Sequence, residues 1–366
     1  MGGVHRCRGV TGSADRSAKR TITRPGPPYD RAVPPAAGIA DHPLGPLLAE
    51  RLESVGRIFE TALASDVPVV NALCRHVERY RGKMLRPTLV IVSGLASRGA
   101  GGDPSEAEHP ERHDTLAAVV EMIHMATLVH DDVLDEADLR RGGATINSLR
   151  GNETAVMLGD YLISSAFRLC STLGDSSLNL ALGETTNALC EGEILQLSHR
   201  GDMALSESTY FDIVRGKTAV LVGSSCRLGA RLSGAHERVC MSLGSFGEEL
   251  GIAFQIQDDV LDLVGDQQVV GKTLGIDLRK GKLTLPLVMH LAGCDAVART
   301  RTLELIRHAD AIGVRDLMET SGAIECARQR ATQMVASAKV RLDSLPSSPA
   351  RDLLHLMADA VVDRSS

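Results

Sequence analysis

The feature that most constrains the fold is a helical repeat of apolar residues that continues through almost the whole chain after Pro43. Apolar residues return every three or four positions, which is the spacing of one helix face, and alternating strand-like runs are scarce. The repeat predicts helices over residues 44–65, 67–81, 86–98, 115–137, 153–173, 177–199, 206–232, 236–264, 284–292, 296–309, 313–320, 322–344 and 349–363. We therefore expect an all-α bundle of long helices.

The composition agrees with a folded core that contains few aromatic residues. Hydrophobic residues make up 43% of the 366 residues and charged residues 23%, a balance that excludes a disordered chain. The sequence has no Trp, 4 Tyr and 5 Phe. Together with a net charge of −6, this excludes nucleic acid as the main partner, because such binding requires basic surfaces and stacking platforms.

Residues 1–43 differ in composition from the rest. Six Lys and Arg residues precede the first of several prolines, and no apolar segment follows these basic residues as it would in a secretory signal. The stretch reads as a disordered tail, with an organellar transit peptide as the alternative. We therefore divide the chain into a tail over 1–43 and one domain over 44–366.

Two internal stretches are rich in helix breakers. Residues 99–114 form a polar stretch, which predicts a loop. Residues 265–283 combine four glycines with four basic residues, which is the composition of a lid that closes over a site.

The eight cysteines are scattered, and none forms a C-x-x-C pair. This usage is typical of reduced thiols in a cytoplasmic protein and argues against a disulfide framework or a zinc site. No uncharged apolar run reaches the ~18 residues of a membrane span, so we expect no transmembrane segment.

The pentapeptide DDVLD occurs twice, at Asp131–Asp135 and at Asp258–Asp262, each near the end of a predicted helix. Residues four apart share a helix face, so the first and last aspartates of each copy project together and repel each other. Carboxylates without His or Cys at ligand spacing favour a hard cation such as Mg²⁺, which usually bridges carboxylates to substrate phosphates. One copy alone would read equally well as a solvated helix end, but two copies favour a metal and a phosphorylated ligand.

The residues that precede each pentapeptide on the same helix face are mostly apolar or small. Before Asp131 they are His124, Thr127 and Leu128, and before Asp258 they are Gly251, Phe254 and Gln255. The pattern predicts a central apolar tunnel below an acidic rim, with room for a ligand that has a charged head and an apolar tail.

Several clusters of basic residues are suited to bind the phosphate groups of such a ligand. Lys83 and Arg86 lie at the start of a predicted helix, where anions are favoured. Arg140 and Arg141 follow the first pentapeptide, although cations before Gly142 are also typical of helix capping. The remaining basic candidates, with one neighbouring hydroxyl, are Lys217, Thr218, Lys272, Arg279, Lys280 and Lys282.

These segments resemble the trans-isoprenyl diphosphate synthases, also called polyprenyl synthetases. The resemblance covers about residues 45–364 and rests on RGKMLRP, VEMIHMATLVHDDVLDEADLRRG, MLGDYLISSAF, GKTA, GIAFQIQDDVLDLVGD and GKTLGIDLRKGKLTLP, which occur in the family order. It implies the all-α isoprenoid synthase fold and a homodimer. It also implies a prenyltransferase that joins isopentenyl diphosphate head-to-tail to an allylic diphosphate, using several Mg²⁺ ions.

The resemblance also implies roles for individual residues. The implied Mg²⁺ ligands are Asp131, Asp135 and Asp258, supported by Asp132 and Asp262. The implied isopentenyl diphosphate site consists of Lys83, Arg86, His124 and Arg141. The implied contacts to the allylic diphosphate are Arg140, Lys217, Lys272 and Lys282. The residues implied to stabilise the allylic cation are Lys217, Thr218 and Gln255. One departure is Arg81, where the family usually has glycine, so the backbone at this position must avoid conformations open only to glycine.

Product length follows from the two residues that lie four and five positions before Asp131. In the family, bulky aromatics at these positions stop chain growth early, whereas here they are Thr127 and Ala126. At a rise of ~1.5 Å per residue they lie ~6–8 Å below the metal site, so the resemblance implies a medium- to long-chain product, roughly C30–C50, such as a quinone side-chain precursor. The alternative is a short-chain enzyme of the geranylgeranyl type. A long product would leave toward a membrane, which implies a peripheral membrane contact.

Three other functions compete with this interpretation. A terpene cyclase or head-to-head synthase shares aspartate-rich helices, but a cyclase lines its pocket with aromatic residues, which are scarce here. A non-catalytic subunit of a two-component synthase loses its aspartates, whereas both motifs are intact here. A helical metal-binding protein without chemistry leaves the ordered basic residues unexplained.

Overall fold

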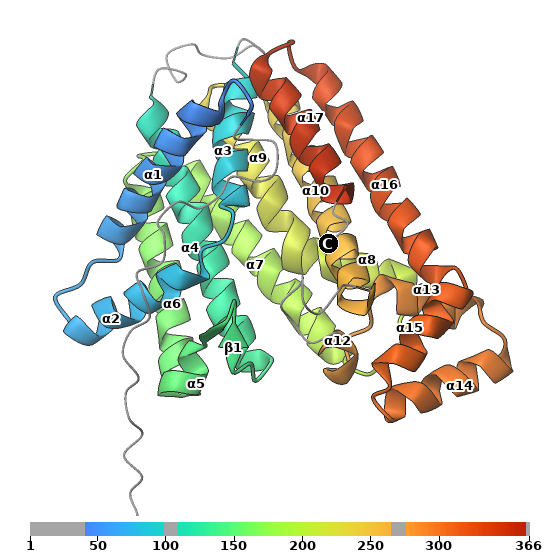
Figure 1. Ribbon diagram of the computed structural model, residues 1–366. Coiled ribbons are helices and arrows are strands. Elements are labelled where there is room, and N and C mark those ends of the chain that lie inside the picture. The colour runs from blue at the N-terminus through green and yellow to red at the C-terminus, as the bar shows by residue number, and fades with distance from the viewer. Residues whose placement is uncertain (1–40, 99–108, 265–275, 364–366) are drawn as a thin grey trace, which may run out of the picture. The chain divides into compact units, whose positions relative to one another are not determined.

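The computed structural model describes residues 41–98, 109–264 and 276–363, all of which fall in one compact unit, Val33–Ser366 (Figure 1). Apart from residues 41–43, the predicted tail lies outside the described residues. The same holds for residues 265–275 of the predicted lid, which include Lys272.

The described residues are helical almost throughout, which confirms the predicted all-α fold. The helices are α1 (Gly45–Ala62), α2 (Pro68–Val77), η1 (Glu78–Tyr80), α3 (Leu85–Ala96), α4 (Pro110–Leu134), α5 (Ile146–Arg150), α6 (Asn152–Ser171), α7 (Ser176–Ser198), α8 (Glu207–Val214), η3 (Arg215–Ala219), α9 (Val220–Leu232), α10 (Glu237–Val264), α12 (Ile276–Arg279), α13 (Leu285–Gly293), α14 (Ala296–Arg307), α15 (Ala311–Thr320), α16 (Ala323–Arg341), η4 (Leu342–Ser344) and α17 (Pro349–Val362).

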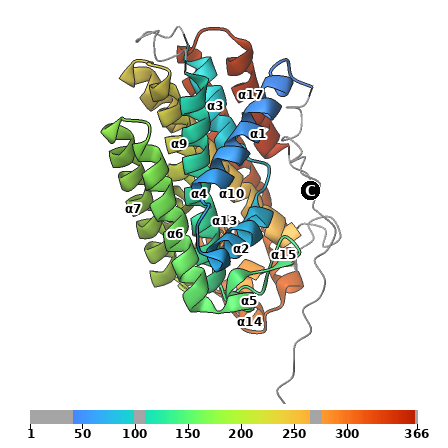
Figure 2. The same ribbon diagram turned by 90° about the vertical axis from the view of Figure 1, so that its left-hand side faces the viewer.

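Helices α4 and α10, which carry the two acidic pentapeptides, lie inside the bundle (Figures 1 and 2). Helix α4 packs against α1, α3, α6 and α9, and α10 packs against α9, α13, α16 and α17. A helix surrounded in this way must be apolar on most of its faces, which explains the long apolar runs before each pentapeptide.

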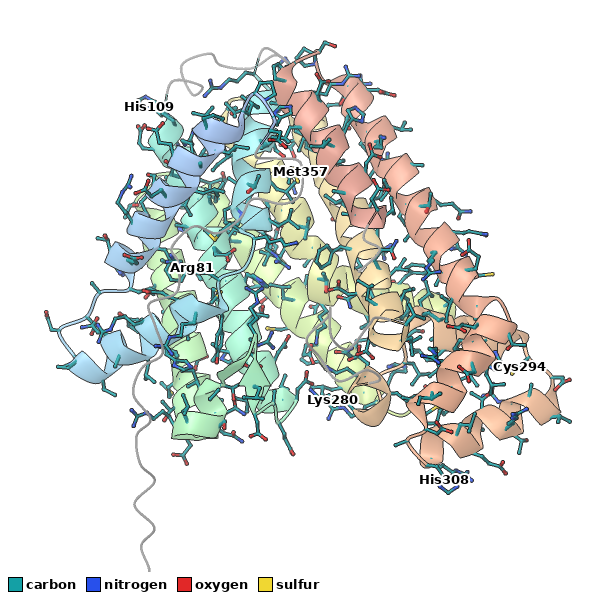
Figure 3. All side chains as sticks on the ribbon, viewed as in Figure 1. Arg81, His109, Lys280, Cys294, His308 and Met357 are labelled. Atoms are coloured by element: carbon teal, nitrogen blue, oxygen red, sulfur yellow. The ribbon has the colours of Figure 1, made fainter. Side chains whose placement is uncertain are left out.

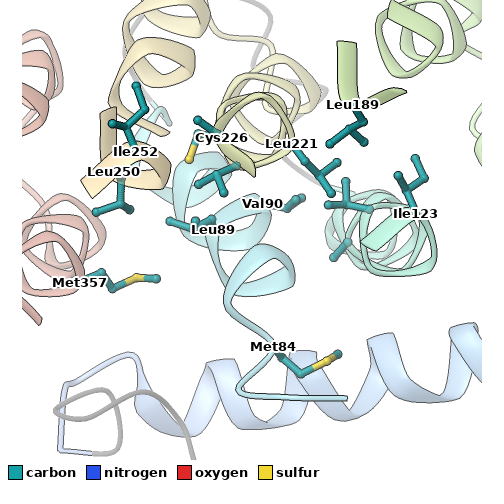
Figure 4. Packing of buried hydrophobic residues seen from close by; sticks show 14 of the residues in the cluster. Met84, Leu89, Val90, Ile123, Leu189, Leu221, Cys226, Leu250, Ile252 and Met357 are labelled. Atoms are coloured by element: carbon teal, nitrogen blue, oxygen red, sulfur yellow. The ribbon is translucent and has the colours of Figure 1, made fainter. Parts of the chain in front are cut away.

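The core between these helices is aliphatic, as the composition predicts. Five residues of one buried cluster are each at most 2% exposed: Leu89 and Val90 of α3, Ile123 of α4, Leu221 of α9 and Leu250 of α10 (Figure 4). Core packing of this kind holds α4 and α10 rigidly, so the acidic residues at their ends are fixed in position.

The structure differs from the predicted helices after the first pentapeptide. Helix α4 ends at Leu134 rather than at residue 137, and a short hairpin follows, in which β1 (Leu139–Arg140) pairs antiparallel with β2 (Gly143–Ala144). Its two turn residues, Arg141 and Gly142, both have positive φ, which matches the twist of a two-residue hairpin. The helix-capping alternative for Arg140 and Arg141 is therefore wrong.

A second difference lies in the predicted helix 206–232, which is interrupted. Helices α8 and α9 are joined by one turn of π-helix, η3, which contains Lys217 and Thr218. Helix α4 begins at Pro110, inside the predicted loop 99–114, whose residues 99–108 lie outside the described residues. Proline is favoured in the first turn of a helix, where its missing N–H leaves no hydrogen bond unmade.

Among the described residues, no helix is both long enough and apolar enough to cross a bilayer.

Candidate active site

The middle of helix α4 is accessible along one narrow stripe. Between Leu116 and Val129, only His124, Thr127 and Leu128 keep partial exposure, and Asp131 and Asp135 continue the same three- and four-residue spacing. The predicted shared face is therefore present, and between Leu116 and Val129 it is the accessible part of an otherwise buried segment.

The two residues proposed to set product length differ in their position on α4. Ala126 is fully buried and lies off the stripe, whereas Thr127 lies on it.

Helix α10 carries a matching stripe. Between Leu250 and Val260, only Phe254, Gln255 and Asp258 keep exposure, and Asp262 follows four residues after Asp258. The carboxylate of Asp262 accepts a weak hydrogen bond from the backbone N–H of Asp277, at 3.4 Å. The second pentapeptide is thus linked to the segment that contains α12.

Three cations surround Asp135 at the end of the first pentapeptide. The ammonium nitrogen of Lys282 lies 2.8 Å from its carboxylate, that of Lys280 3.4 Å, and the Arg200 guanidinium 3.9 Å. Burial would raise the pKa of Asp135, but the hydrogen bond from Lys282 and the charges of Lys280 and Lys217 outweigh it and hold the pKa below its usual value. Asp135 is therefore ionised at neutral pH.

Lys217 lies beside Asp131, at the start of the same pentapeptide. Its ammonium lies 3.8 Å from the Asp131 carboxylate, and it donates to Glu193 and, at 2.8 Å, to Gln196 of α7. Although burial lowers the pKa of Lys217, the carboxylates of Asp131 and Glu193 raise it overall, so the ammonium stays charged.

Close contact between α7 and the π-helical turn brings Lys217 to this place. Gly192 and Gly216 touch through their backbones: a Cβ at Gly216 would lie 2.8 Å from the Gly192 Cα. Only glycine permits such an approach. The irregular turn therefore lies directly against α7, within reach of Glu193 and Gln196, and single π turns are frequent at functional sites.

A chain of hydrogen bonds runs from Thr218 to the interior. Thr218 Oγ1 donates to Gln255 Oε1 at 3.1 Å, and Gln255 Nε2 donates to Asp259 Oδ1 at 3.0 Å. Asp259 Oδ2 accepts from the Tyr210 hydroxyl at 2.7 Å. Burial and the nearby charge of Asp277 raise the pKa of Asp259 to about 7, despite these donors. The structure thus joins Thr218 to Gln255 by a hydrogen bond.

Asp132 does not share the stripe with its neighbours. It is 1% exposed and accepts a 2.8 Å hydrogen bond from Arg140 Nε. Burial raises the pKa of Asp132 to about 6. In this arrangement Asp132 fixes the hairpin to the end of α4, and Arg140 pairs with a carboxylate.

A second basic cluster consists of Arg81, Arg86 and Arg141, near Glu121 of α4. The guanidinium of Arg141 lies against Gly82, where a Cβ would come within 2.5 Å of it. Buried Glu121 of α4 interacts electrostatically with Arg81, Arg86 and Arg141. Figure 3 labels Arg81 of this cluster and Lys280, one of the cations around Asp135.

The second cluster has spare hydrogen-bonding capacity. Within the described part of the chain, Arg86 Nε is buried and has no hydrogen-bond partner, which suits an anionic ligand. Burial and the adjacent charges of Arg86 and Arg141 lower the pKa of His124 well below its usual value, so this imidazole is neutral. Lys83 is exposed beside the cluster.

The backbone at Arg81 meets the expectation for a residue that replaces glycine. It has φ −54° and ψ 129°, which any residue can adopt. Its guanidinium lies 4.2 Å from the centre of the Phe59 ring, a cation–π contact that holds the longer side chain in place.

Several residues of the site were not predicted from the sequence. Glu193 and Gln196 are three apart in GEILQ, a spacing that places them on one helix face and was available as a signal. Tyr210, Arg200 and Glu121 carried no signal, because each depends on a partner far away in the chain. Asp259 gave no separate signal, because it is the second aspartate of a pentapeptide that is interpreted as a whole.

The donor set fits Mg²⁺. The two stripes offer carboxylates and no sulfur ligands, and among residues 41–98, 109–264 and 276–363 no group of three His, Cys, Asp or Glu side chains converges on one point. Carboxylate oxygens are the donors that Mg²⁺ takes in proteins, together with water and phosphate oxygens.

Comparison with known proteins identifies the family of this chain. Residues 67–320 match the polyprenyl synthetase family. The octaprenyl diphosphate synthase of Escherichia coli is 35% identical over 322 residues, which cover 87% of this chain and 97% of that enzyme.

Two solved structures are also similar. A decaprenyl diphosphate synthase from Rhodobacter capsulatus has a TM-score of 0.81 at 34% identity, covering 91% of this chain and 100% of that one. A polyprenyl synthase from Caulobacter crescentus, crystallised with calcium and isoprenyl diphosphate, has a TM-score of 0.80 at 32% identity, covering 92% and 100%. This chain therefore belongs to the polyprenyl synthetase family.

Proposed function

We propose that the protein is a Mg²⁺-dependent polyprenyl diphosphate synthase that adds isopentenyl diphosphate head-to-tail to an allylic diphosphate and makes a medium- to long-chain product. The observation that carries the proposal is the pair of acidic stripes on α4 and α10, together with the ion pairs of Lys217 with Asp131 and of Lys282 with Asp135 on the first of them. Family membership supports the same reaction.

The allylic diphosphate binds at the acidic rim. Asp131, Asp135 and Asp258 hold the metal ions, with Asp132 and Asp262 in support. When bound, Mg²⁺ neutralises charge on the departing diphosphate. Lys217 and Lys282 contact the same diphosphate, as do Arg140 and Lys272 in our assignment. Lys217 and Lys282 already face the carboxylates of Asp131 and Asp135, so little reorganisation of these two cations is needed when the diphosphate leaves.

Isopentenyl diphosphate binds at the second basic cluster. Lys83, Arg86 and Arg141 take its diphosphate, and the unpartnered Arg86 Nε is one free donor for it. Neutral His124 lies on the accessible stripe between this cluster and Asp131. The position of His124 directs the double bond of isopentenyl diphosphate toward the allylic carbon.

The allylic cation is stabilised by the dipoles of two uncharged groups, the amide of Gln255 and the hydroxyl of Thr218. Gln255 Oε1 of the second stripe and Thr218 Oγ1 of η3 lie 3.1 Å apart, and Lys217, the neighbour of Thr218 in sequence, pairs with Asp131. The C–O bond of the allylic substrate breaks, the double bond of isopentenyl diphosphate attacks the resulting cation, and a proton is then lost to the released diphosphate.

The growing chain passes Thr127 and Ala126. Both side chains are small, and Thr127 lies on the accessible stripe, so a long product can pass this level. The similar synthases named for octaprenyl and decaprenyl diphosphate support a long product. Release of such a product involves a peripheral contact with a membrane.

Two copies of the chain form the enzyme in our proposal. Met157 of α6 and Leu180 and Ile194 of α7 are between 64% and 66% exposed, and the two helices lie side by side at one edge of the unit (Figure 2). A second copy would cover these apolar residues. The seven cysteines in the described ranges are free thiols, which suits the reduced cytoplasm.

The test is an elongation assay with purified protein, Mg²⁺, labelled isopentenyl diphosphate and allylic primers of graded length. We expect label in products of medium to long chain. Products that stop at the geranylgeranyl length would establish the short-chain alternative. No elongation with any primer, while a control synthase works, would refute the proposed function.

A further inference from the structure

The buried aspartate of the second pentapeptide is held by three donors. Tyr210 Oη donates to Asp259 Oδ2 at 2.7 Å, and the backbone N–H of Leu285 donates to the same oxygen at 3.2 Å. Gln255 Nε2 donates to Oδ1 at 3.0 Å. Asp259 is 5% exposed and Tyr210 3% exposed, so this cluster lies behind the accessible stripe.

This arrangement determines which end of the Gln255 amide faces the site. The two ends of a glutamine amide are almost equal in shape, so hydrogen bonding decides its orientation. In its carboxylate form, Asp259 accepts hydrogen bonds at both oxygens and therefore requires the NH₂ group of Gln255 on its side. The carbonyl oxygen is left for the opposite side, where it accepts from Thr218 Oγ1 at 3.1 Å.

We propose that Asp259 and Tyr210 are positioning residues that keep the Gln255 carbonyl oxygen turned toward the allylic cation. The inference rests on the role proposed above for Gln255. A carbonyl oxygen places negative charge where positive charge develops, whereas a reversed amide would place two N–H groups there and oppose the reaction. The second aspartate of this pentapeptide thus acts through Gln255 and not through a metal.

The first test is Tyr210→Phe, which removes one donor to Asp259 and leaves every proposed substrate contact intact. We expect kcat to fall about 10-fold, as for other residues that orient a catalytic group. The KM values for both diphosphates and the Mg²⁺ concentration for half-maximal rate should stay unchanged. The matched control is Tyr161→Phe, whose hydroxyl donates to the Leu63 carbonyl at 3.3 Å, and which should keep the wild-type rate.

The second test is Asp259→Asn, for which we expect a larger loss. Tyr210 and Leu285 both donate to Oδ2, so the single oxygen of an asparagine is drawn to that position and its NH₂ group faces Gln255. The Gln255 amide must then turn over. We expect kcat to fall about 100-fold, the loss typical when a transition-state contact is removed. If this variant does not fold, as judged by circular dichroism, Tyr210→Phe still decides.

The Gln255→Leu background separates a positioning role from other effects. If Tyr210 acts through Gln255, Tyr210→Phe should have no further effect on kcat in that background. An equal loss in both backgrounds, an unchanged kcat for Tyr210→Phe, or a change confined to KM would overturn the positioning role alone. A wild-type rate for Gln255→Leu itself would overturn both the catalytic role of Gln255 and this inference.

Discussion

Lys282 donates a 2.8 Å hydrogen bond to Asp135, a residue 147 positions earlier in the chain. The bond joins the end of the first acidic pentapeptide to the segment that follows the second. Lys280 and Arg200 lie near the same carboxylate, so three cations face one anion. In our proposal, Lys282 also contacts the allylic diphosphate that binds beside this carboxylate.

The first prediction concerns Lys282. We expect Lys282→Gln to lower kcat about 100-fold, because the ammonium faces charge that develops on the leaving diphosphate. Initial rates of labelled isopentenyl diphosphate incorporation measure the effect. The control is Lys339→Gln, which loses an ion pair of the same 2.8 Å length to Asp359 and should keep the wild-type rate. Similar rates for both variants would exclude Lys282 from the diphosphate site.

The second prediction concerns Gly82. A methyl group there would come within 2.5 Å of the Arg141 guanidinium, and the flexible arginine would move aside. We expect Gly82→Ala to raise the KM for isopentenyl diphosphate about 10-fold, the cost of one weakened charged hydrogen bond, with little change in stability. Gly183→Ala is the control, because a methyl group there meets no atom within 4 Å. An unchanged KM would place isopentenyl diphosphate elsewhere.

The long helices could be predicted because their apolar repeat is continuous. The expected helix 236–264 corresponds to α10 over Glu237–Val264, and the accessible stripe of α4 follows from the spacing of His124, Thr127 and Asp131. The hairpin could not be predicted, since two-residue strands have no alternation to detect. The π turn at η3 depends on the Gly192–Gly216 contact with another helix, which a local pattern does not contain.

The two pentapeptides also show where local sequence stops being informative. Their second aspartates are identical in sequence context, yet Asp132 pairs with Arg140 of a hairpin and Asp259 with Tyr210 of α8. Tertiary partners, which come from elsewhere in the chain, assign the two residues different environments. Lys217 likewise has its ammonium fixed by Glu193 of α7, a helix that its own sequence neighbourhood does not identify.

The third prediction concerns product length. We expect Thr127→Phe to shorten the product, because Thr127 lies on the accessible stripe four residues below Asp131. We expect Ala126→Phe to shorten it as well, but to lower stability by about 1–3 kcal/mol, because Ala126 is fully buried and its site must be overpacked. Chromatography of labelled products and thermal unfolding measure the two effects.

Thr115→Phe is the matched control for product length. Thr115 lies near the start of α4 and, like Thr127, bonds its hydroxyl to the carbonyl of a preceding residue. It is distant from the pentapeptide along the helix, so its products should keep the wild-type length. Wild-type products from both the Thr127 and Ala126 variants would show that the chain does not pass this level of α4.

The fourth prediction concerns stability and pH. His113 is 3% exposed, and its Nε2 lies 3.0 Å from both the Gly229 carbonyl and Ser233 Oγ. Burial lowers the pKa of His113 from 6.5 to about 4. At a pH between these two values, the unfolded chain binds a proton at His113 that the folded chain does not. The contribution of His113 to the free energy of unfolding is therefore fully present above pH 6.5 and is lost toward pH 4. The full loss is up to about 3 kcal/mol.

The measurement is the free energy of unfolding in denaturant between pH 4 and pH 7, for the wild type and His113→Gln. Asp132 acts in the opposite direction, because its raised pKa of about 6 makes the folded chain bind the extra proton. The difference between the two proteins therefore isolates His113, and it should shrink as the pH falls. His308→Gln, at an exposed position, should follow the wild type at every pH. A parallel pH dependence for wild type and His113→Gln would mean that the buried imidazole does not titrate in this range on unfolding.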